Sequence, residues 1–156
     1  MADGNGGEMP QLDALAQYVK DFSFENPHAP RSLQPKAAPP EINVQVNVNA
    51  KDLGNGEFEV ELSLDGEAGK GEDMLFRFDV VYAGIFRLVN IPQEHVHQVV
   101  MIECPRMLFP FARAIVANAV RDGGFPPFLL QPIDFGALYQ ARVAEVQQGG
   151  NNNRVN

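Results

Sequence analysis

The sequence contains few residues of the kinds that carry redox chemistry, metal binding or nucleic-acid recognition. Of its 156 residues, one is cysteine, three are histidine and none is tryptophan. A single cysteine cannot form an intrachain disulfide, which favours a reducing compartment such as the cytoplasm. The chain has 12 lysines and arginines against 20 aspartates and glutamates, for a net charge of −8. Because phosphate binding needs clustered basic residues, this balance argues against nucleic acid as the main partner.

Long apolar segments are also missing. No run approaches the roughly 18 uncharged apolar residues of a membrane-spanning helix. The first residues, 1–8, are polar and lack the basic region and apolar core of a signal peptide. We therefore expect a cytoplasmic protein without direct membrane insertion.

No residue pattern typical of a catalytic or metal site stands out. Cys104 precedes Pro105 at an expected helix start, where the helix dipole can lower a thiol pKa, but no base accompanies it in the sequence. His95 and His97 have a spacing that resembles metal ligands. On a helix, however, their side chains point about 200° apart and cannot share one ion. We predict no enzyme activity, no bound metal and no cofactor.

Two neighbouring segments, 41–50 and 57–65, alternate apolar and polar residues with a period of two. This pattern predicts strands with one buried and one wet face. The apolar positions are Ile42, Val44, Val46, Val48, Phe58, Val60, Leu62 and Leu64. The wet face of the second segment is acidic, with Glu57, Glu59, Glu61 and Asp65. Such a face suits docking of a cationic partner, and the alternative is a solubilising surface that prevents sheet aggregation.

The remaining elements follow from turn residues and changes of period. We expect a first strand at 16–25 with Tyr18, Phe22 and Phe24 on one face, and a fourth at about 73–88 with a bulge or bend at Gly84. The proline-rich segment 26–40 predicts a crossover to another position in the sheet, and Asn55-Gly56 predicts a hairpin turn.

Helical spacing follows the fourth strand. It begins near Pro92, is broken at Pro105, resumes from about Arg106 to Gly123, and returns at 135–147. The order of strands and then helices predicts an α+β fold, a four-stranded antiparallel sheet with helices on one face. Residues 11–147 are expected to form a single domain, flanked by disordered tails at 1–10 and 148–156.

An irregular segment, 125–133, is unusually apolar. It contains Phe125, Phe128, Leu129, Leu130 and Ile133 among prolines. Such a segment covers the core of its own chain, forms an oligomer interface, or lines a groove for extended apolar peptide.

Several long motifs, in one order along residues 11–147, resemble the SecB family of protein-export chaperones. They are Lys20-Asp-Phe-Ser-Phe-Glu25, Val81-Tyr-Ala-Gly-Ile-Phe86, Glu103-Cys-Pro-Arg-Met-Leu-Phe-Pro-Phe-Ala-Arg113, Asp122-Gly-Gly-Phe-Pro-Pro and Pro132-Ile-Asp-Phe. The resemblance implies an ATP-independent cytosolic holdase with a SecB-like fold. It also implies a homotetramer, a dimer of dimers, that binds unfolded precursor proteins in grooves and delivers them to the export ATPase SecA.

The resemblance also implies site residues. The SecA-docking acids are Asp21, Glu25 and Asp79, and the alternation alone adds Glu59 and Glu61. The client-binding groove residues are Phe24, Ile42, Val44, Phe128, Leu130, Phe135, Leu138 and Tyr139. Two departures from the family pattern are Arg77, two residues from Asp79, and a crossover loop without tryptophan. The runner-up function is an adaptor that binds a folded cationic partner and has no peptide groove.

Overall fold

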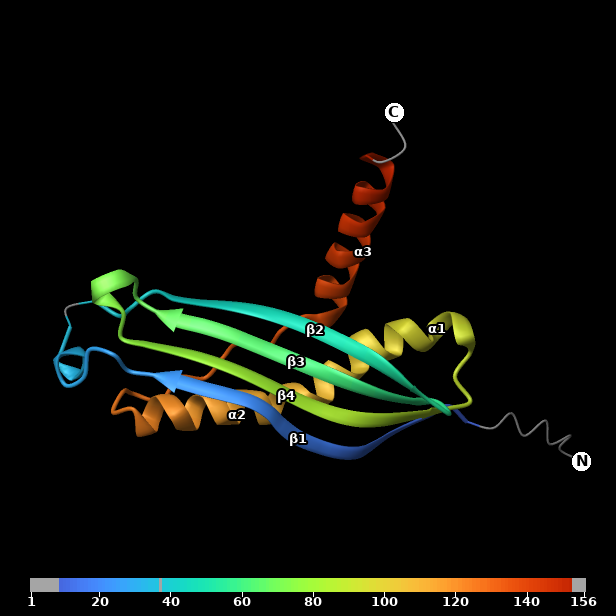
Figure 1. Cartoon of the computed structure of the whole chain (residues 1–156), viewed down its shortest axis with the longest axis horizontal. Coiled ribbons are helices and arrows are strands. Elements are labelled where there is room, and N and C mark those ends of the chain that lie inside the picture. The colour runs from blue at the N-terminus through green and yellow to red at the C-terminus, as the bar shows by residue number, and fades with distance from the viewer. Residues whose placement is uncertain (1–8, 37, 153–156) are drawn as a thin grey trace, which may run out of the picture.

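The computed structural model describes residues 9–36 and 38–152, which form one sheet with helices beneath it (Figure 1). The sheet is antiparallel and four-stranded, in the order β1-β4-β3-β2. Its strands are β1 (Gln11–Glu25), β2 (Ile42–Gly54), β3 (Glu57–Ala68) and β4 (Phe76–Val89). This confirms the predicted α+β class and the four-stranded antiparallel sheet.

The connections between the strands follow the predicted turns. The proline-rich segment after β1 carries the chain from one edge of the sheet to the other, where β2 lies, through a short 3-10 helix at Arg31–Leu33. The predicted crossover is therefore confirmed. Asn55 and Gly56 join β2 to β3 with φ angles of 56° and 75°, the left-handed conformation that a tight hairpin turn requires.

The face assigned to Tyr18 was wrong, because β1 is bulged. The pairing of β1 with β4 shifts between Ala14 and Ala16 and again between Val19 and Asp21, so that Leu15 and Lys20 are extra residues. The second bulge inverts the alternation. Tyr18 therefore lies on the same face as Asp21, whereas Phe22 and Phe24 lie on the other face.

The bulge expected at Gly84 is not there, because Gly84 pairs regularly with Gln17. The lack of a side chain serves close packing instead. A Cβ atom at Gly84 would lie 3.0 Å from the carbonyl oxygen of Ala16 and 3.1 Å from Leu108 Cδ2. Glycine at this position lets a helix approach the sheet closely.

The helices are α1 (Gln93–Gln98), α2 (Cys104–Asp122) and α3 (Phe135–Asn152). The predicted break at Pro105 was wrong. A π-helical stretch, Val99–Glu103, joins α1 directly to α2, and Pro105 occupies the first turn of α2, where its missing N–H costs little. Gly124, with φ of 95°, follows α2 as predicted. The last helix continues to Asn152, beyond its expected end at 147. Residues 148–152, which were expected to belong to a disordered tail, form the last part of α3, and residues 1–8 and 153–156 of the expected tails lie outside the described residues.

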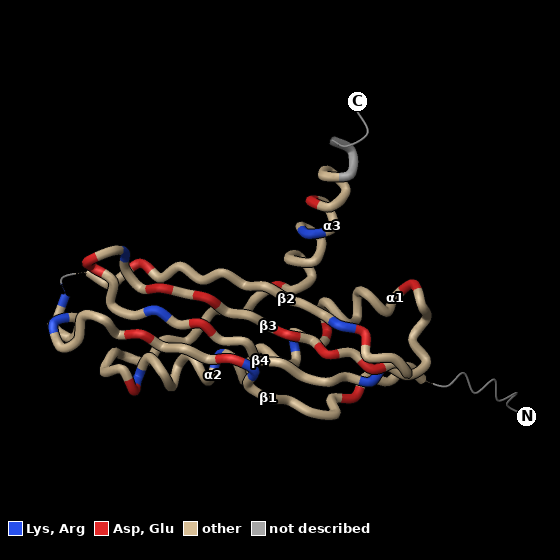
Figure 2. The backbone as a smooth tube through the Cα atoms, viewed as in Figure 1, with Lys and Arg blue, Asp and Glu red and all other residues tan. Residues whose placement is uncertain are grey.

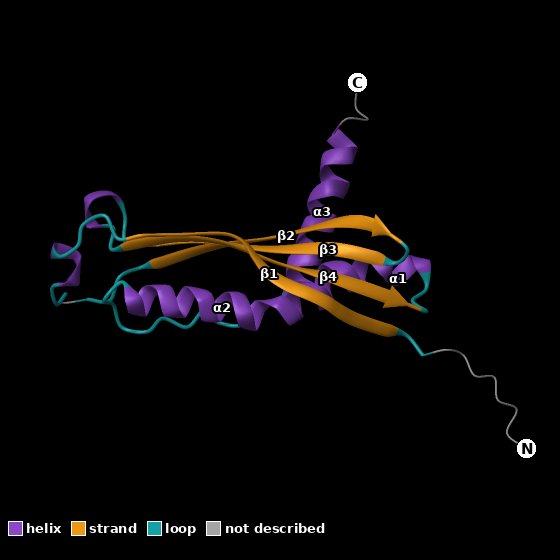
Figure 3. Ribbon diagram, turned by 60° about the horizontal axis from the view of Figure 1, so that its bottom comes forward, coloured by secondary structure: helices purple, strands orange, loops and turns teal. Residues whose placement is uncertain are grey.

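Helix α2 covers one face of the sheet, which we call the inner face (Figure 3). It contributes Leu108, Ala112, Val116 and Val120 to the core, and all four are fully buried. Their sheet partners in this core include Val60, Leu62, Leu64, Phe78 and Phe86. Helix α3 behaves differently, because only its first turns pack on the core and the rest projects past the edge of β2 (Figure 1). Within residues 9–36 and 38–152, no helix covers the opposite, outer face of the sheet (Figure 3).

Candidate functional site

The predicted docking acids all lie on the outer face. Asp21 and Glu25 come from β1, Asp79 from β4, and Glu59 and Glu61 from β3. On β3 and β4 these positions alternate with buried inner-face residues. Figure 2 shows these acidic positions distributed along the whole length of the sheet. Strand alternation, set by the apolar inner residues, therefore gathers charges that lie far apart in the sequence onto one surface.

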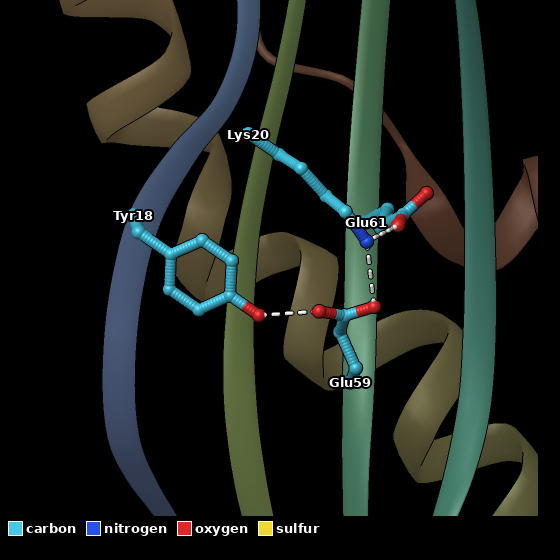
Figure 4. Close-up of polar contacts among 4 residues, drawn as sticks. All are labelled: Tyr18, Lys20, Glu59 and Glu61. Atoms are coloured by element: carbon cyan, nitrogen blue, oxygen red, sulfur yellow. Dashed lines mark hydrogen bonds and ion pairs between the residues drawn. The ribbon is translucent and has the colours of Figure 1, made fainter.

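Near the β2–β3 hairpin, the outer-face acids are paired with basic or hydroxyl groups. Tyr18 donates its hydroxyl proton to Glu59 Oε2 at 2.5 Å, and Lys20 Nζ donates to Glu59 Oε1 at 2.9 Å. The same ammonium group also contacts Glu61 (Figure 4). Arg87 Nη2 donates to Glu57 Oε1 at 2.6 Å. Glu57, Glu59 and Glu61 therefore already have partners within the chain.

The pKa values in this cluster report the same pairing. Burial, and then the bond to Glu59, raise the pKa of Tyr18 to about 12. The hydrogen bond from Tyr18, and then that from Lys20, lower the pKa of Glu59. The hydrogen bonds to Glu61 and Glu59 raise the pKa of Lys20. All three shifts favour an ionised Glu59 whose two oxygens are occupied.

The other end of the outer face holds acids that face one another. Asp65 on β3 lies directly opposite Asp79 on β4. On the other side of β4, Asp21 of β1 lies diagonally across from Asp79. Partial burial, then the charges of Asp65 and Asp21, raise the pKa of Asp79. Arg77 contacts Asp65 rather than Asp79, with Nη2 3.9 Å from Asp65 Oδ2. The charge of Arg77 also acts on Asp79 and lowers its pKa, but less than burial and the two neighbouring acids raise it.

An open groove of about 820 Å³ lies on the inner side, where α3 passes the edge of β2. Its apolar lining comes from five elements, β2, β3, α1, the π-helical stretch and α3, and includes Val48, Ala50, Phe58, Val96, Val100, Met101, Val143 and Val146. The predicted groove residue Tyr139 lines it too. Two polar contacts hold α3 against this groove. Tyr139 Oη is 3.0 Å from His97 Nδ1, and Arg142 Nη1 donates to the carbonyl oxygen of Val48 at 2.6 Å.

A second groove, of about 460 Å³, lies at the other end of the inner face. It runs between the crossover loop and the apolar segment that follows α2, and its lining includes the predicted residues Ile42 and Phe128. Phe24 lies against this groove, because its ring stacks on Phe76, a lining residue, at a centroid distance of 5.9 Å. Leu33, Phe125 and several prolines complete an apolar wall.

The remaining predicted groove residues pack inward. Leu130 is 7% exposed and Phe135 is 1% exposed, so both belong to the core of the chain. Val44 and Leu138 are half-buried and pack against that core. None of these four residues lines either groove, and a direct contact with a client stays a prediction for them.

The residues weighed for other chemistry lie apart from one another. Cys104 is buried, and this burial raises the pKa of its thiol to about 12. His97 is engaged with Tyr139, and His95 lies exposed on α1. Within residues 9–36 and 38–152, no group of three histidine, cysteine or acidic side chains is placed to hold a metal ion. None of the helices described there is long and apolar enough to cross a membrane.

Comparison with known proteins identifies the family. A family model described as preprotein translocase subunit SecB matches residues 5–146. The chain belongs to the SecB family. Family membership confirms the resemblance carried by the sequence motifs and supports a role as a protein-export chaperone.

Relatives cover nearly the whole chain. The protein-export protein SecB of Rhodopseudomonas palustris (strain TIE-1) is 55% identical over 154 residues, covering 96% of this chain and 98% of that protein. The SecB of Bradyrhizobium sp. (strain BTAi1) is 57% identical over 148 residues, and the match covers 92% of this chain and 91% of the Bradyrhizobium protein. A solved SecB-like chaperone of Mycobacterium tuberculosis, in complex with a ChAD peptide from an antitoxin, has a TM-score of 0.61 at 14% identity. That match covers 78% of this chain and 87% of the other. At this identity the likeness shows that the fold is SecB-like.

The structure adds functional residues that sequence reasoning on this SecB-family chain missed. Arg142 and His97 position α3, and helix α1 supplies part of a groove wall. Lys20 pairs with Glu59 and Glu61 from two strands away. Sequence spacing carried no signal for these contacts, because each joins segments about 40 or more residues apart.

Proposed function

We propose that this SecB-family protein is a cytoplasmic, ATP-independent holdase that binds unfolded precursor proteins and delivers them to SecA. The observation that carries the proposal is the division of the sheet into two surfaces. Its outer face is charged and, in the part of the chain that the structure describes, is not covered by a helix, whereas its inner side holds two apolar grooves. One layer of β-structure thus separates a surface suited to a folded cationic partner from surfaces suited to extended apolar chain.

The grooves suit weak capture of unfolded segments. Both are open along their length and lined mainly by aliphatic and aromatic side chains and proline. Burying about 500 Å² of apolar client surface yields on the order of 10 kcal/mol before costs, at about 25 cal/mol per Å². Ordering of the client and loss of its free motion consume much of this energy. A single groove therefore binds weakly, and several grooves acting on one chain bind tightly through effective concentration.

A homotetramer, a dimer of dimers, would bring several grooves together. Uncovered apolar side chains at the β1 edge and on α2 support such an assembly. They are Leu15, Val19, Phe22, Met107 and Phe111, which are 39% to 50% exposed. Phe111 stacks on Tyr82 at a centroid distance of 5.9 Å, which places an aromatic pair at the edge of the inner face. A second copy would cover this surface. Light scattering then gives a mass near four times 17.2 kDa, and a stable monomer would contradict the assembly.

Binding of a permanently unfolded client separates the holdase from an adaptor. A reduced, carboxymethylated protein has no folded state to recover, so it reports capture of unfolded chain alone. We expect the protein to bind it and to release the same protein in its native, disulfide-bonded form. An adaptor without a peptide groove would bind SecA and ignore the unfolded chain.

Charge reversal on β1 tests docking. The expected docking residues are Asp21, Glu25 and Asp79, and Asp21 and Glu25 are both exposed. Asp21→Lys or Glu25→Lys should reduce SecA affinity and its dependence on salt, and should leave client affinity unchanged, because these side chains lie on the face opposite the grooves. SecA affinity equal to that of the wild type in both variants would count against this face.

A further inference from the structure

The acidic outer face consists of two electrically different halves. The paired half, near the β2–β3 hairpin, contains Glu57, Glu59 and Glu61 together with Arg87 and Lys20. The open half, at the opposite end, contains Asp21, Glu25, Asp65, Glu67 and Asp79. Among the described residues, the open half makes one ion pair, the 3.9 Å contact between Arg77 and Asp65. Among these residues, three acids share two basic groups in the paired half, whereas five acids share one basic group, Arg77, in the open half.

The bulge in β1 explains how Lys20 reaches the acids of β3. As an extra residue, Lys20 has no partner on β4, and its side chain crosses that strand to reach Glu59 and Glu61 (Figure 4). The span is two strand spacings, roughly 10 Å, which a fully extended lysine can cover together with the long side chains of glutamate. A lysine in a regular strand would stand over its own neighbours instead.

Lys20 and Tyr18 together occupy both carboxylate oxygens of Glu59. Its Oε1 atom accepts from Lys20 and its Oε2 atom from Tyr18. A lysine from a partner protein would have to displace the internal ammonium before it gained the same bonds. Exchange of one charge pair for an equivalent one contributes little to affinity.

We propose that Lys20 acts as an intramolecular competitor that occupies Glu59 and Glu61 and confines a cationic partner to the open half, where Asp65 joins the docking acids. This inference rests on the proposed docking of SecA to the outer face. The chemistry that fits the open half is a basic peptide segment, because carboxylates on directly opposite residues, whose Cβ atoms lie about 5 Å apart, can each accept a lysine or arginine. Binding would also remove the repulsion between Asp65 and Asp79.

Two lysine substitutions with equal charge provide a matched test. Lys20→Met removes the competitor and keeps the length of the side chain. Lys51→Met removes the same charge from β2, at a position directly opposite Glu59 in the strand register, where Lys51 makes no ion pair among the described residues. Both substituted lysines are exposed, and thermal unfolding verifies that each variant folds. Octalysine and SecA are then titrated calorimetrically against the wild type and both variants at low ionic strength.

We expect Lys20→Met to bind octalysine roughly three- to tenfold more tightly than Lys51→Met, because only the first variant frees two carboxylates. Addition of Glu59→Gln and Glu61→Gln to Lys20→Met should abolish this gain. Equal affinities of the two lysine variants for octalysine would overturn the inference, whatever SecA does. Failure of SecA to bind any variant, with the octalysine gain intact, would instead overturn the proposed function and leave the competition by Lys20 supported.

Discussion

Asp65 and Asp79 lie directly opposite each other on adjacent antiparallel strands, so that two carboxylates face the same point on the outer surface. Directly opposed like charges destabilise a sheet. The raised pKa of Asp79, caused by partial burial and by the charges of Asp65 and Asp21, has the same origin. Arg77 relieves this repulsion only in part, through its 3.9 Å contact with Asp65, so a further positive charge on this surface is stabilising.

Asp79→Asn should therefore stabilise the folded protein at neutral pH by a few tenths of a kcal/mol. A carboxyl whose pKa is raised on folding stabilises most below its unfolded pKa, and this stabilisation is lost as pH rises through the folded pKa. The wild type should therefore lose this stabilisation as pH rises above about 4, whereas the variant, which lacks the carboxyl group, should show no such loss. Urea unfolding as a function of pH measures the difference. Glu145→Gln, which removes a charge from the exposed part of α3, is the control, and an equal gain there would show a net-charge effect alone.

Tyr18→Phe should raise the pKa of Glu59, because the tyrosine hydroxyl makes the largest contribution to its depression. A depressed carboxyl pKa stabilises the fold above the unfolded value, and that stabilisation is lost as pH falls through the folded value. The variant should accordingly be less stable than the wild type near neutral pH, by about 0.5 to 1 kcal/mol, and the difference should shrink in acid. Carboxyl carbon NMR titration reads the pKa directly. An unchanged pKa of Glu59 would contradict the bond seen in the structure.

Gly66→Ala should destabilise the fold by about 1 to 3 kcal/mol. Gly66 lies in β3 opposite Phe78, and an added Cβ atom would overlap the fully buried phenylalanine ring. Gly149→Ala is the matched control, since a Cβ atom at that position of α3 meets no atom within 4 Å. The control should be neutral or slightly stabilising, because alanine favours helix. Denaturant unfolding measures the free energy of unfolding of both variants. Equal values would show that the ring of Phe78 can shift without loss of stability.

Much of the sheet could be predicted from the sequence, because apolar and polar residues alternate along its strands with a period of two. Val60, Leu62 and Leu64 alternate with Glu59 and Glu61, and the structure places each set on the expected face. The crossover and the hairpin were likewise predictable, because proline and Asn-Gly restrict the backbone locally.

The face of Tyr18 could not be predicted, because a bulge is a property of two paired strands. Lys20 becomes an extra residue only by comparison with the register of β4. The ion pairs of Lys20 with Glu59 and Glu61 depend on this bulge, so they could not be predicted either. The grooves were predicted in part. Ile42, Phe128 and Tyr139 line the grooves, whereas Leu130 and Phe135 are core residues. The sequence does not distinguish the two, because an apolar side chain can pack into the core or line a groove.

Val146→Asp should weaken binding of an unfolded client roughly tenfold, which corresponds to the loss of one apolar contact of valine size and the burial of a charge. Val146 is 76% exposed and lines the larger groove, so the substitution should leave stability unchanged. Ala144→Asp is the control, because it adds the same charge to an exposed position of α3 about 200° around the helix. Fluorescence anisotropy of a labelled, permanently unfolded protein measures both variants. Equal losses would indicate a general charge effect.

The central claim is that the two sides of one sheet bind different partners independently. The most direct test measures SecA and a permanently unfolded client, each by calorimetry, against Asp21→Lys and Val146→Asp. Asp21→Lys should reduce the affinity for SecA and leave the affinity for the client unchanged. Val146→Asp should reduce the affinity for the client and leave the affinity for SecA unchanged. If either variant lost both partners while remaining folded and assembled, the separation of docking and capture would be contradicted.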